Sequence, residues 1–212
     1  MYLFTRSARL AHGRLAEAMD WAVRVTEKVN QISTTPVNLW STVFSPGVGT
    51  LTWTTFAEDL ATLEATEAKC MADGTYLDLV NEGATFAAAD AIDDGLVQVV
   101  FTERDPAGDA PAYVNVVRAV LAPGAIASGL ELGVQIAQRA TAVTGCPCSF
   151  GAAASGPYGG VVWFTGCESI EQLQQAQQAI FADTELIGLI DEKASRAYLP
   201  GVAVQTVYRK IV

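Results

Sequence analysis

The spacing of apolar and polar positions changes its period along the first sixty residues. Residues 2–7 are rich in β-forming residues, and from Leu15 to Ile32 apolar residues recur at helical spacing. Two further β-rich runs, residues 37–44 and 49–56, flank the turn residues Ser45-Pro46-Gly47. This pattern predicts a strand, then a helix of about five turns, then a β-hairpin.

A second helix is expected after the hairpin. Thr55-x-x-Glu58, and Thr165-x-x-Glu168 further along, precede apolar-periodic stretches and match the capping-box pattern. In that motif the Thr hydroxyl accepts from a backbone amide and the Glu carboxylate reaches back. A further helical piece is expected at Tyr76–Asn81, and Leu96–Glu103 is expected to supply a fourth strand.

The same plan recurs in the second half of the chain. Shifting the sequence by 111 residues places Tyr2 on Tyr113 and Gly13 on Gly124, and after the hairpin a shift of 110 places Trp53 on Trp163. Self-similarity at a fixed spacing indicates a repeated folding unit. The fourth strand of the second copy is expected at residues 203–211.

The predicted fold is α+β, with two tandem ferredoxin-like βαββαβ repeats forming a dimeric α/β barrel within one chain or between chains. The repeats cover residues 1–104 and 112–212, and residues 105–111 have the composition of a linker. We expect two helices to cover one face of each sheet. The other face is expected to be apolar and to require a cover.

With this repeat and the Trp53 and Trp163 strand-to-helix segments, the chain resembles the dimeric α/β-barrel superfamily in its tandem, fused form. It looks closest to NIPSNAP-like or antibiotic-biosynthesis-monooxygenase-like members. That superfamily includes cofactor-free monooxygenases, isomerases, haem-binding peroxidases and dismutases, and stress-related binding proteins. The resemblance therefore implies a fold and leaves the chemistry open.

The composition of the chain disfavours some classes of binding partner. The formal net charge is −10, and the 13 Lys and Arg residues are scattered, which disfavours nucleic acids and acidic membranes. No apolar run approaches the roughly 20 residues that span a bilayer. Arg6 and Arg9 stand where a signal peptide would need its apolar stretch. We expect a cytoplasmic protein whose four cysteines remain thiols.

Three residues are candidates for catalysis. His12 is the only histidine, and it suits either a helix-entry turn or a general acid or base. Arg6 and Arg118 lie on the first strands of the two copies, where an inward guanidinium needs a carboxylate or an anionic ligand. Metal sites that need two imidazoles are excluded. Haem-dependent relatives use a proximal histidine that the second half lacks, so no cofactor is expected, and haem ligation by Cys or Tyr stays open as the alternative.

The aromatic residues have two interpretations. Trp40, Trp53, Trp163 and Tyr113 fall on predicted strands, where they either fill the core or form a flat wall for an aromatic ligand. We treat the four as candidate ligand-binding residues.

The cysteines favour a structural role. Cys146-Pro147-Cys148 has a spacing that suits a metal or a strained disulfide, but no second such pair accompanies it. Ordinary buried thiols are the favoured interpretation. Cys70 and Cys167 are expected to be small apolar core groups.

Two classes of function remain open, and the sequence does not decide whether the protein is an enzyme. One is a cofactor-free monooxygenase or isomerase that acts on a small hydrophobic molecule inside one half-barrel. The other is a non-catalytic protein that sequesters a ligand or assembles as a homo-oligomer. An open pocket reached by Arg6, His12 or Arg118 would favour the enzyme.

Overall fold

The computed structural model describes residues 1–11, 13–105 and 108–212, and the side chains at 89–91 also lie outside the description. The chain forms two compact units. The first comprises residues 1–96 and 209–212, and the second comprises residues 97–208. Strands β4 (Ala87–Phe101) and β8 (Val204–Lys210) each contribute to both units. The expected linker, 105–111, includes two residues outside the description.

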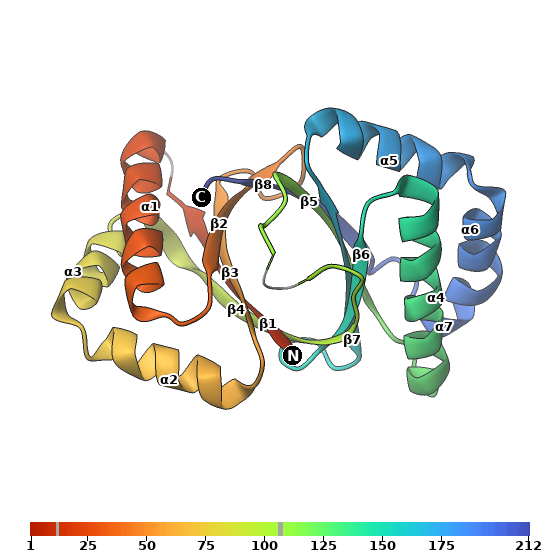
Figure 1. The fold of residues 1–212 in the computed structure, drawn as a ribbon, viewed down its shortest axis with the longest axis horizontal. Coiled ribbons are helices and arrows are strands. Elements are labelled where there is room, and N and C mark those ends of the chain that lie inside the picture. The colour runs from red at the N-terminus through yellow and green to blue at the C-terminus, as the bar shows by residue number, and fades with distance from the viewer. Residues whose placement is uncertain (12, 106–107) are drawn as a thin grey trace. The chain divides into compact units, whose positions relative to one another are not determined.

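The first unit has the predicted order of strand, helix, hairpin and two more helices (Figure 1). Its elements are β1 (Tyr2–Leu10), α1 (Leu15–Ile32), β2 (Val37–Val43), β3 (Thr50–Ala57), α2 (Leu60–Met71) and α3 (Gly74–Gly83). The bounds confirm the predicted first helix and hairpin. Strand β4 begins nine residues before the predicted start at Leu96, because its first half continues beside β1.

The second unit follows a similar order. Its elements are β5 (Tyr113–Val120), α4 (Ile126–Thr144), β6 (Cys148–Ala153), β7 (Gly160–Cys167), α5 (Ile170–Ala182), α6 (Thr184–Leu189), the π-helical turn η1 (Ile190–Ala194) and α7 (Ser195–Ala197). In each unit the helices gather on one side of the strands (Figure 1). The layering is thus that of an α+β fold.

The strand pairing is antiparallel wherever its register is defined. The pairing order is closed, β1-β3-β2-β8-β5-β7-β6-β4. Arg6 pairs with Trp53 across β1 and β3, and Val117 pairs with Trp163 across β5 and β7. Directly opposite residues project on the same face of a sheet, so these registers determine which side chains meet the helices.

The core of the first unit lies between its sheet and α1. Buried residues of α1 recur at the spacing of one helix face, as Ala18, Trp21, Ala22, Val25 and Thr26. The rings of Trp21 and Trp53 meet edge to face, with centroids 5.7 Å apart. Leu39 and Leu51 are fully buried in the same cluster, and burial of such a side chain contributes about 1.5–3 kcal/mol.

The second unit has a comparable core against α4. Phe150 is fully buried, and its ring lies 5.0 Å from that of Trp163, measured between centroids. The Tyr198 ring meets Trp163 edge to face, and its hydroxyl donates to the carbonyl of Gly129 at 2.6 Å. Each unit therefore centres its core on a tryptophan of its inner hairpin strand.

The predicted capping boxes are wrong. Thr55 and Thr165 lie inside β3 and β7, where they pair with neighbouring strands. The helices begin later. Asp59 caps α2 by accepting from the amide of Thr62 at 2.8 Å, and Ser169 caps α5 by accepting from that of Gln172 at 3.1 Å. The Thr-x-x-Glu pattern misled because both threonines still belong to the β-rich run.

The expectation of an apolar helix-free face is also wrong for the first unit. Thr5 lies opposite Thr54, and Ser7 lies opposite Thr52, on the face away from α1. The hydroxyls of Ser7 and Thr52 are 2.9 Å apart, and the indole N–H of Trp40 donates to Thr54 Oγ1 at 2.8 Å. These hydrogen bonds across the strands stabilise polar side chains on this face of the sheet.

The helix-free face of the second unit is closer to the predicted apolar face. Val116 lies opposite Phe164, and Val162 lies opposite Arg118, on the face away from α4. Val116 and Val162 are buried, and Arg118 is exposed. The helix-free faces of the two units therefore differ in chemistry.

Candidate functional site

The first unit holds a half-buried ion pair between its first and fourth strands. Arg6 on β1 lies opposite Trp53 and therefore projects toward the helices. Its Nε donates to Asp94 Oδ1 at 2.7 Å, and its Nη2 donates to Asp94 Oδ2 at 2.6 Å. Such a two-pronged contact fixes the plane of the guanidinium as well as its position. On this helix-facing side, Arg6 thus has the carboxylate partner that a half-buried cation requires.

Arg6 also interacts with aromatic and thiol side chains of the same unit. The Arg6 guanidinium lies 5.7 Å from the centre of the Phe4 ring. Its charge also acts on Tyr76 of α3 and on Cys70 of α2. Burial raises the pKa of the Tyr76 phenol, although the Arg6 charge opposes that shift. Tyr76 is therefore held as a neutral phenol beside a permanent cation.

The guanidinium keeps unused hydrogen-bonding capacity. Arginine carries five N–H donors, and the contact with Asp94 uses two of them. The hydrogen bond that Arg6 donates to Asp94 is the main reason that the pKa of Arg6 is raised, so the cation is permanent. With 38% of its side chain exposed, Arg6 can be reached from solvent. The arrangement can bind an oxygen anion or a polarised hydroxyl next to an aromatic ring.

The other two catalytic candidates do not join this cluster. His12 lies outside the described residues. Arg118 belongs to the second unit, where it stands exposed on β5 opposite Val162. Among the residues that the structure describes, Arg6 has an ion pair between strands and Arg118 has none.

The four aromatic candidates occupy different settings. Trp53 and Trp163 lie in the helix-covered cores, where their indole N–H groups donate to Thr26 Oγ1 and to the carbonyl of Gly133, both at 2.9 Å. Trp40 is 5% exposed on the polar, helix-free face of the first unit. Tyr113 is half-buried at the start of β5.

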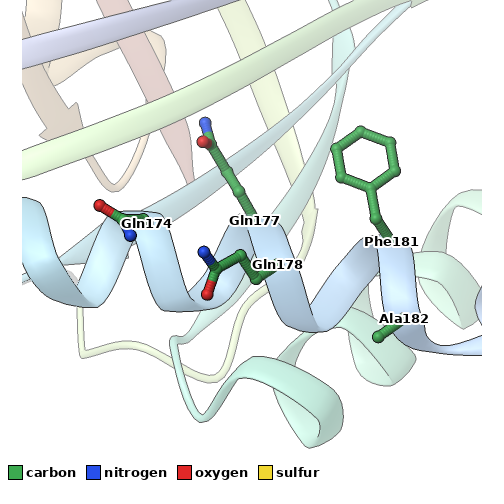
Figure 2. Close-up of a pocket in the computed structure, with 5 residues that line it drawn as sticks. All are labelled: Gln174, Gln177, Gln178, Phe181 and Ala182. Atoms are coloured by element: carbon green, nitrogen blue, oxygen red, sulfur yellow. The ribbon is translucent and has the colours of Figure 1, made fainter.

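One surface hollow of about 570 Å³ lies along α5 of the second unit. Figure 2 shows its lining residues, all of them on that helix: Gln174, Gln177, Gln178, Phe181 and Ala182. None of the predicted site residues lines it. Because a single helix supplies every lining residue, the hollow lacks convergent groups from other elements and is not the candidate site.

Sequence reasoning missed most of the cluster around Arg6. Asp94 lies 88 residues further along the chain, in a part of β4 that was not predicted to be a strand. Tyr76 was placed on a helix without a role. The available signal was an arginine within a β-rich run. If such a side chain becomes partly buried, it requires a carboxylate or an anion, which a distant segment can supply.

The comparisons with known proteins bear on the fold. No protein-family model and no curated protein matches the sequence. A proposed monooxygenase from Fusobacterium nucleatum has a similar structure, with 7% identity, a TM-score of 0.73, and coverage of 100% of this chain and 92% of the other. An anthrone oxidase-like protein matches with 12% identity, a TM-score of 0.64, and coverage of 100% and 91%.

A chlorite dismutase variant from Candidatus Nitrospira defluvii also matches, with 13% identity, a TM-score of 0.53, and coverage of 98% of this chain and 90% of the other. Together with the closed strand order, these matches show that the chain shares an α+β fold with these solved structures. The similar structures include monooxygenase-like and dismutase proteins. The predicted resemblance is confirmed for the fold. Sequence identities this low do not indicate which activity the protein has.

Two absences hold for the described part of the chain. No helix there has the length and apolar character needed to cross a bilayer. Nor do His, Cys, Asp and Glu side chains gather there in a group of three that could hold a metal ion.

Proposed function

We propose that the first unit binds a small hydroxylated aromatic molecule through Arg6, and that the protein oxidises this molecule with molecular oxygen without a cofactor. The observation that carries the proposal is the half-buried guanidinium, which Asp94 orients and which keeps unused donors beside Tyr76. The similar structures of a proposed monooxygenase and an anthrone oxidase-like protein support the same class of reaction.

The chemistry needs a substrate that ionises easily. A methylene flanked by aromatic rings and a conjugated carbonyl loses a proton to form an enolate, whose oxygen the Arg6 guanidinium stabilises. The Tyr76 phenol donates a hydrogen bond to the same or a neighbouring oxygen. The electron-rich carbon then reduces O2. One oxygen atom becomes a carbonyl at that carbon, and the other leaves as water with the two methylene hydrogens.

The two halves of the chain are not equivalent in this proposal. We propose that they descend from an internal duplication, as the aligned pairs Tyr2 and Tyr113, Trp53 and Trp163 suggest. The position of Arg6 then corresponds to Val117. At this position of the repeat the first unit would therefore carry a charged residue and the second an apolar one, so the first unit would bind the ligand while the second supports the fold. A cytoplasmic location and a homo-oligomeric state remain part of this proposal.

A non-catalytic role is the second candidate. Asp94 neutralises the charge of Arg6, which weakens the stabilisation of an enolate and favours an uncharged phenol as ligand. A protein that sequesters such a ligand would bind it and leave it unchanged. Trp40, Trp53, Trp163 and Tyr113 remain candidates for contact with an aromatic ligand in either case.

The test uses 1,8-dihydroxyanthrone as probe, with binding measured by calorimetry without oxygen and turnover measured as oxygen uptake. We expect binding and catalysed oxygen uptake in the wild type, and at least a tenfold loss of both in Arg6→Gln. The matched control is Arg24→Gln, because Arg24 makes a similar two-pronged contact with Glu82 in the same unit, at 3.0 and 2.6 Å.

Each outcome decides between the candidates. Binding without catalysed oxygen uptake would establish the sequestering role. Equal losses in Arg6→Gln and Arg24→Gln would show that the ion pair matters only for folding. Absence of binding to the wild type would end the proposal of a hydroxyanthrone-like ligand.

A further inference from the structure

Two buried cysteines of the second unit face each other. The sulfur atoms of Cys146 and Cys167 are 3.6 Å apart, and both side chains are fully buried. Cys148, the other half of the Cys-x-Cys motif, is also buried, but its sulfur lies 3.9 Å from the carbonyl oxygen of Ser149. All four cysteines are free thiols, as expected. The close pair is therefore formed across two strands and not within the sequence motif.

The strand register explains why these two side chains meet. Cys148 lies opposite Thr165 in the antiparallel pair of β6 and β7, so Pro147 lies opposite Gly166 and Cys146 opposite Cys167. The amide of Gly166 donates to the carbonyl of Pro147 at 3.2 Å, so these two opposite residues form a hydrogen-bonded pair. Hydrogen-bonded and non-hydrogen-bonded pairs alternate along antiparallel strands. Cys146 and Cys167 therefore form a non-hydrogen-bonded pair, in which Cα atoms are about 4.5 Å apart.

A second hydrogen bond supports this assignment. The amide of Cys148 donates to Thr141 Oγ1 on α4 at 2.9 Å. Cys148 and Thr165 are therefore also a non-hydrogen-bonded pair, as the alternation requires. Disulfides need Cα atoms roughly 4.4–6.8 Å apart with converging side chains. The backbone around Cys146 and Cys167 thus already has a separation that a disulfide accepts.

We propose that Cys146 and Cys167 form an intrachain disulfide when the protein meets a peroxide. The two S–H bonds and the O–O bond of the peroxide break, one S–S bond forms, and the oxygen atoms leave as water, or as water and an alcohol from an organic peroxide. The two sulfurs lose two electrons, and the peroxide gains them. The link ties the second residue after α4 to the last residue of β7.

The reaction is expected to be slow and selective. Burial raises the pKa of the Cys167 thiol, and the neighbouring Cys146 adds to the shift. Few molecules therefore carry a thiolate at neutral pH, and the burial of both thiols limits their contact with the oxidant. Once formed, the disulfide closes a loop of about 20 residues. The apparent unfolding midpoint should then rise by roughly 6–12 °C.

The experiment oxidises the native full chain with hydrogen peroxide, then alkylates remaining thiols under denaturing conditions and maps the peptides by mass spectrometry. We expect two of the four thiols to become unreactive, with a cross-link between the peptides that hold Cys146 and Cys167. Dithiothreitol should restore all four. The melting midpoint of the oxidised protein, measured beside the reduced protein, should rise as stated.

Two variants provide the matched comparison. Cys148→Ala removes an equally buried thiol and leaves the pair, so the cross-link should still form. Cys167→Ala removes one partner, and the cross-link should disappear. The mapping of the wild type tests the proposal even if a variant fails to fold. Four reactive thiols after native oxidation, a dominant link between Cys146 and Cys148, or linkage only above the melting midpoint would each overturn the proposal.

Discussion

The indole N–H of Trp53 on β3 donates to the hydroxyl of Thr26 on α1 at 2.9 Å, and both residues are buried. The same hydroxyl donates to the carbonyl of Ala22 at 2.7 Å. Thr26 is thus both acceptor and donor between helix and sheet. In the second unit the indole of Trp163 donates to the backbone carbonyl of Gly133 instead. Each tryptophan is therefore oriented by a hydrogen bond in addition to apolar packing.

Replacing Thr26 by valine should leave the Trp53 N–H without an acceptor. We expect a loss of about 1–3 kcal/mol in the free energy of unfolding, since a buried donor loses its partner at nearly constant side-chain volume. Denaturant titration measures this loss. The double variant with Trp53→Phe should lose less than the sum of the single variants. Additive losses would show that the hydrogen bond contributes nothing.

The close contact of Gly133 with Phe150 predicts a strong effect of one added methyl group. A Cβ at position 133 would lie 2.1 Å from the Phe150 ring, and that ring is fully buried. Gly133→Ala should therefore destabilise the protein by roughly 1–3 kcal/mol through overpacking. The control is Gly188→Ala on α6, where a Cβ meets nothing within 4 Å. That variant should be neutral or more stable by up to about 1 kcal/mol, because alanine favours a helix.

The ion pair of Arg6 and Asp94 should contribute modestly to stability. A double-mutant cycle with Arg6→Gln and Asp94→Asn is expected to give a coupling energy of about 1 kcal/mol, because both side chains are partly exposed, at 38% and 46%. Chemical denaturation of the four proteins measures it. The cycle for Arg24 and Glu82, exposed at 49% and 40%, should give a smaller value. A larger coupling there would contradict the special position of Arg6.

Asp183 predicts a defined dependence of stability on pH. The Arg139 guanidinium, followed by the amide of Leu186, lowers the pKa of Asp183 in the folded protein. A lowered folded pKa stabilises the protein above the ordinary aspartate pKa, and this contribution is lost as the pH falls through the lowered value. Asp183→Asn keeps the helix cap and removes the charge. It should be less stable than the wild type at neutral pH.

The difference between the two proteins should vanish in acid. Unfolding is measured between neutral pH and the acid limit of the folded state, with Asp78→Asn as a control that removes an exposed carboxylate of α3. The control should show no comparable convergence. A gap between wild type and Asp183→Asn that stays constant down to the acid limit would contradict the assignment.

Local pattern was sufficient for the elements whose residues interact within a short stretch of chain. The helical spacing from Leu15 to Ile32 coincides with α1, and the turn at Ser45-Pro46-Gly47 separates β2 from β3. Helix spacing and turn chemistry act over a few residues, so the sequence determines them directly. The helix caps were mistaken because Thr55 and Thr165 serve a strand, and strand pairing outweighs a local capping pattern.

The pairing of strands from distant parts of the chain decided which reactive side chains lie together. Arg6 was visible as a candidate from the sequence, but its partner Asp94 comes from a strand 88 residues later. Cys146 appeared to belong with Cys148, and only the pairing of β6 with β7 places it against Cys167. The sequence by itself thus determined most of the elements and their order along the chain. Tertiary structure alone decided which side chains meet, because strand register joins residues whose separation along the chain leaves no periodic signal.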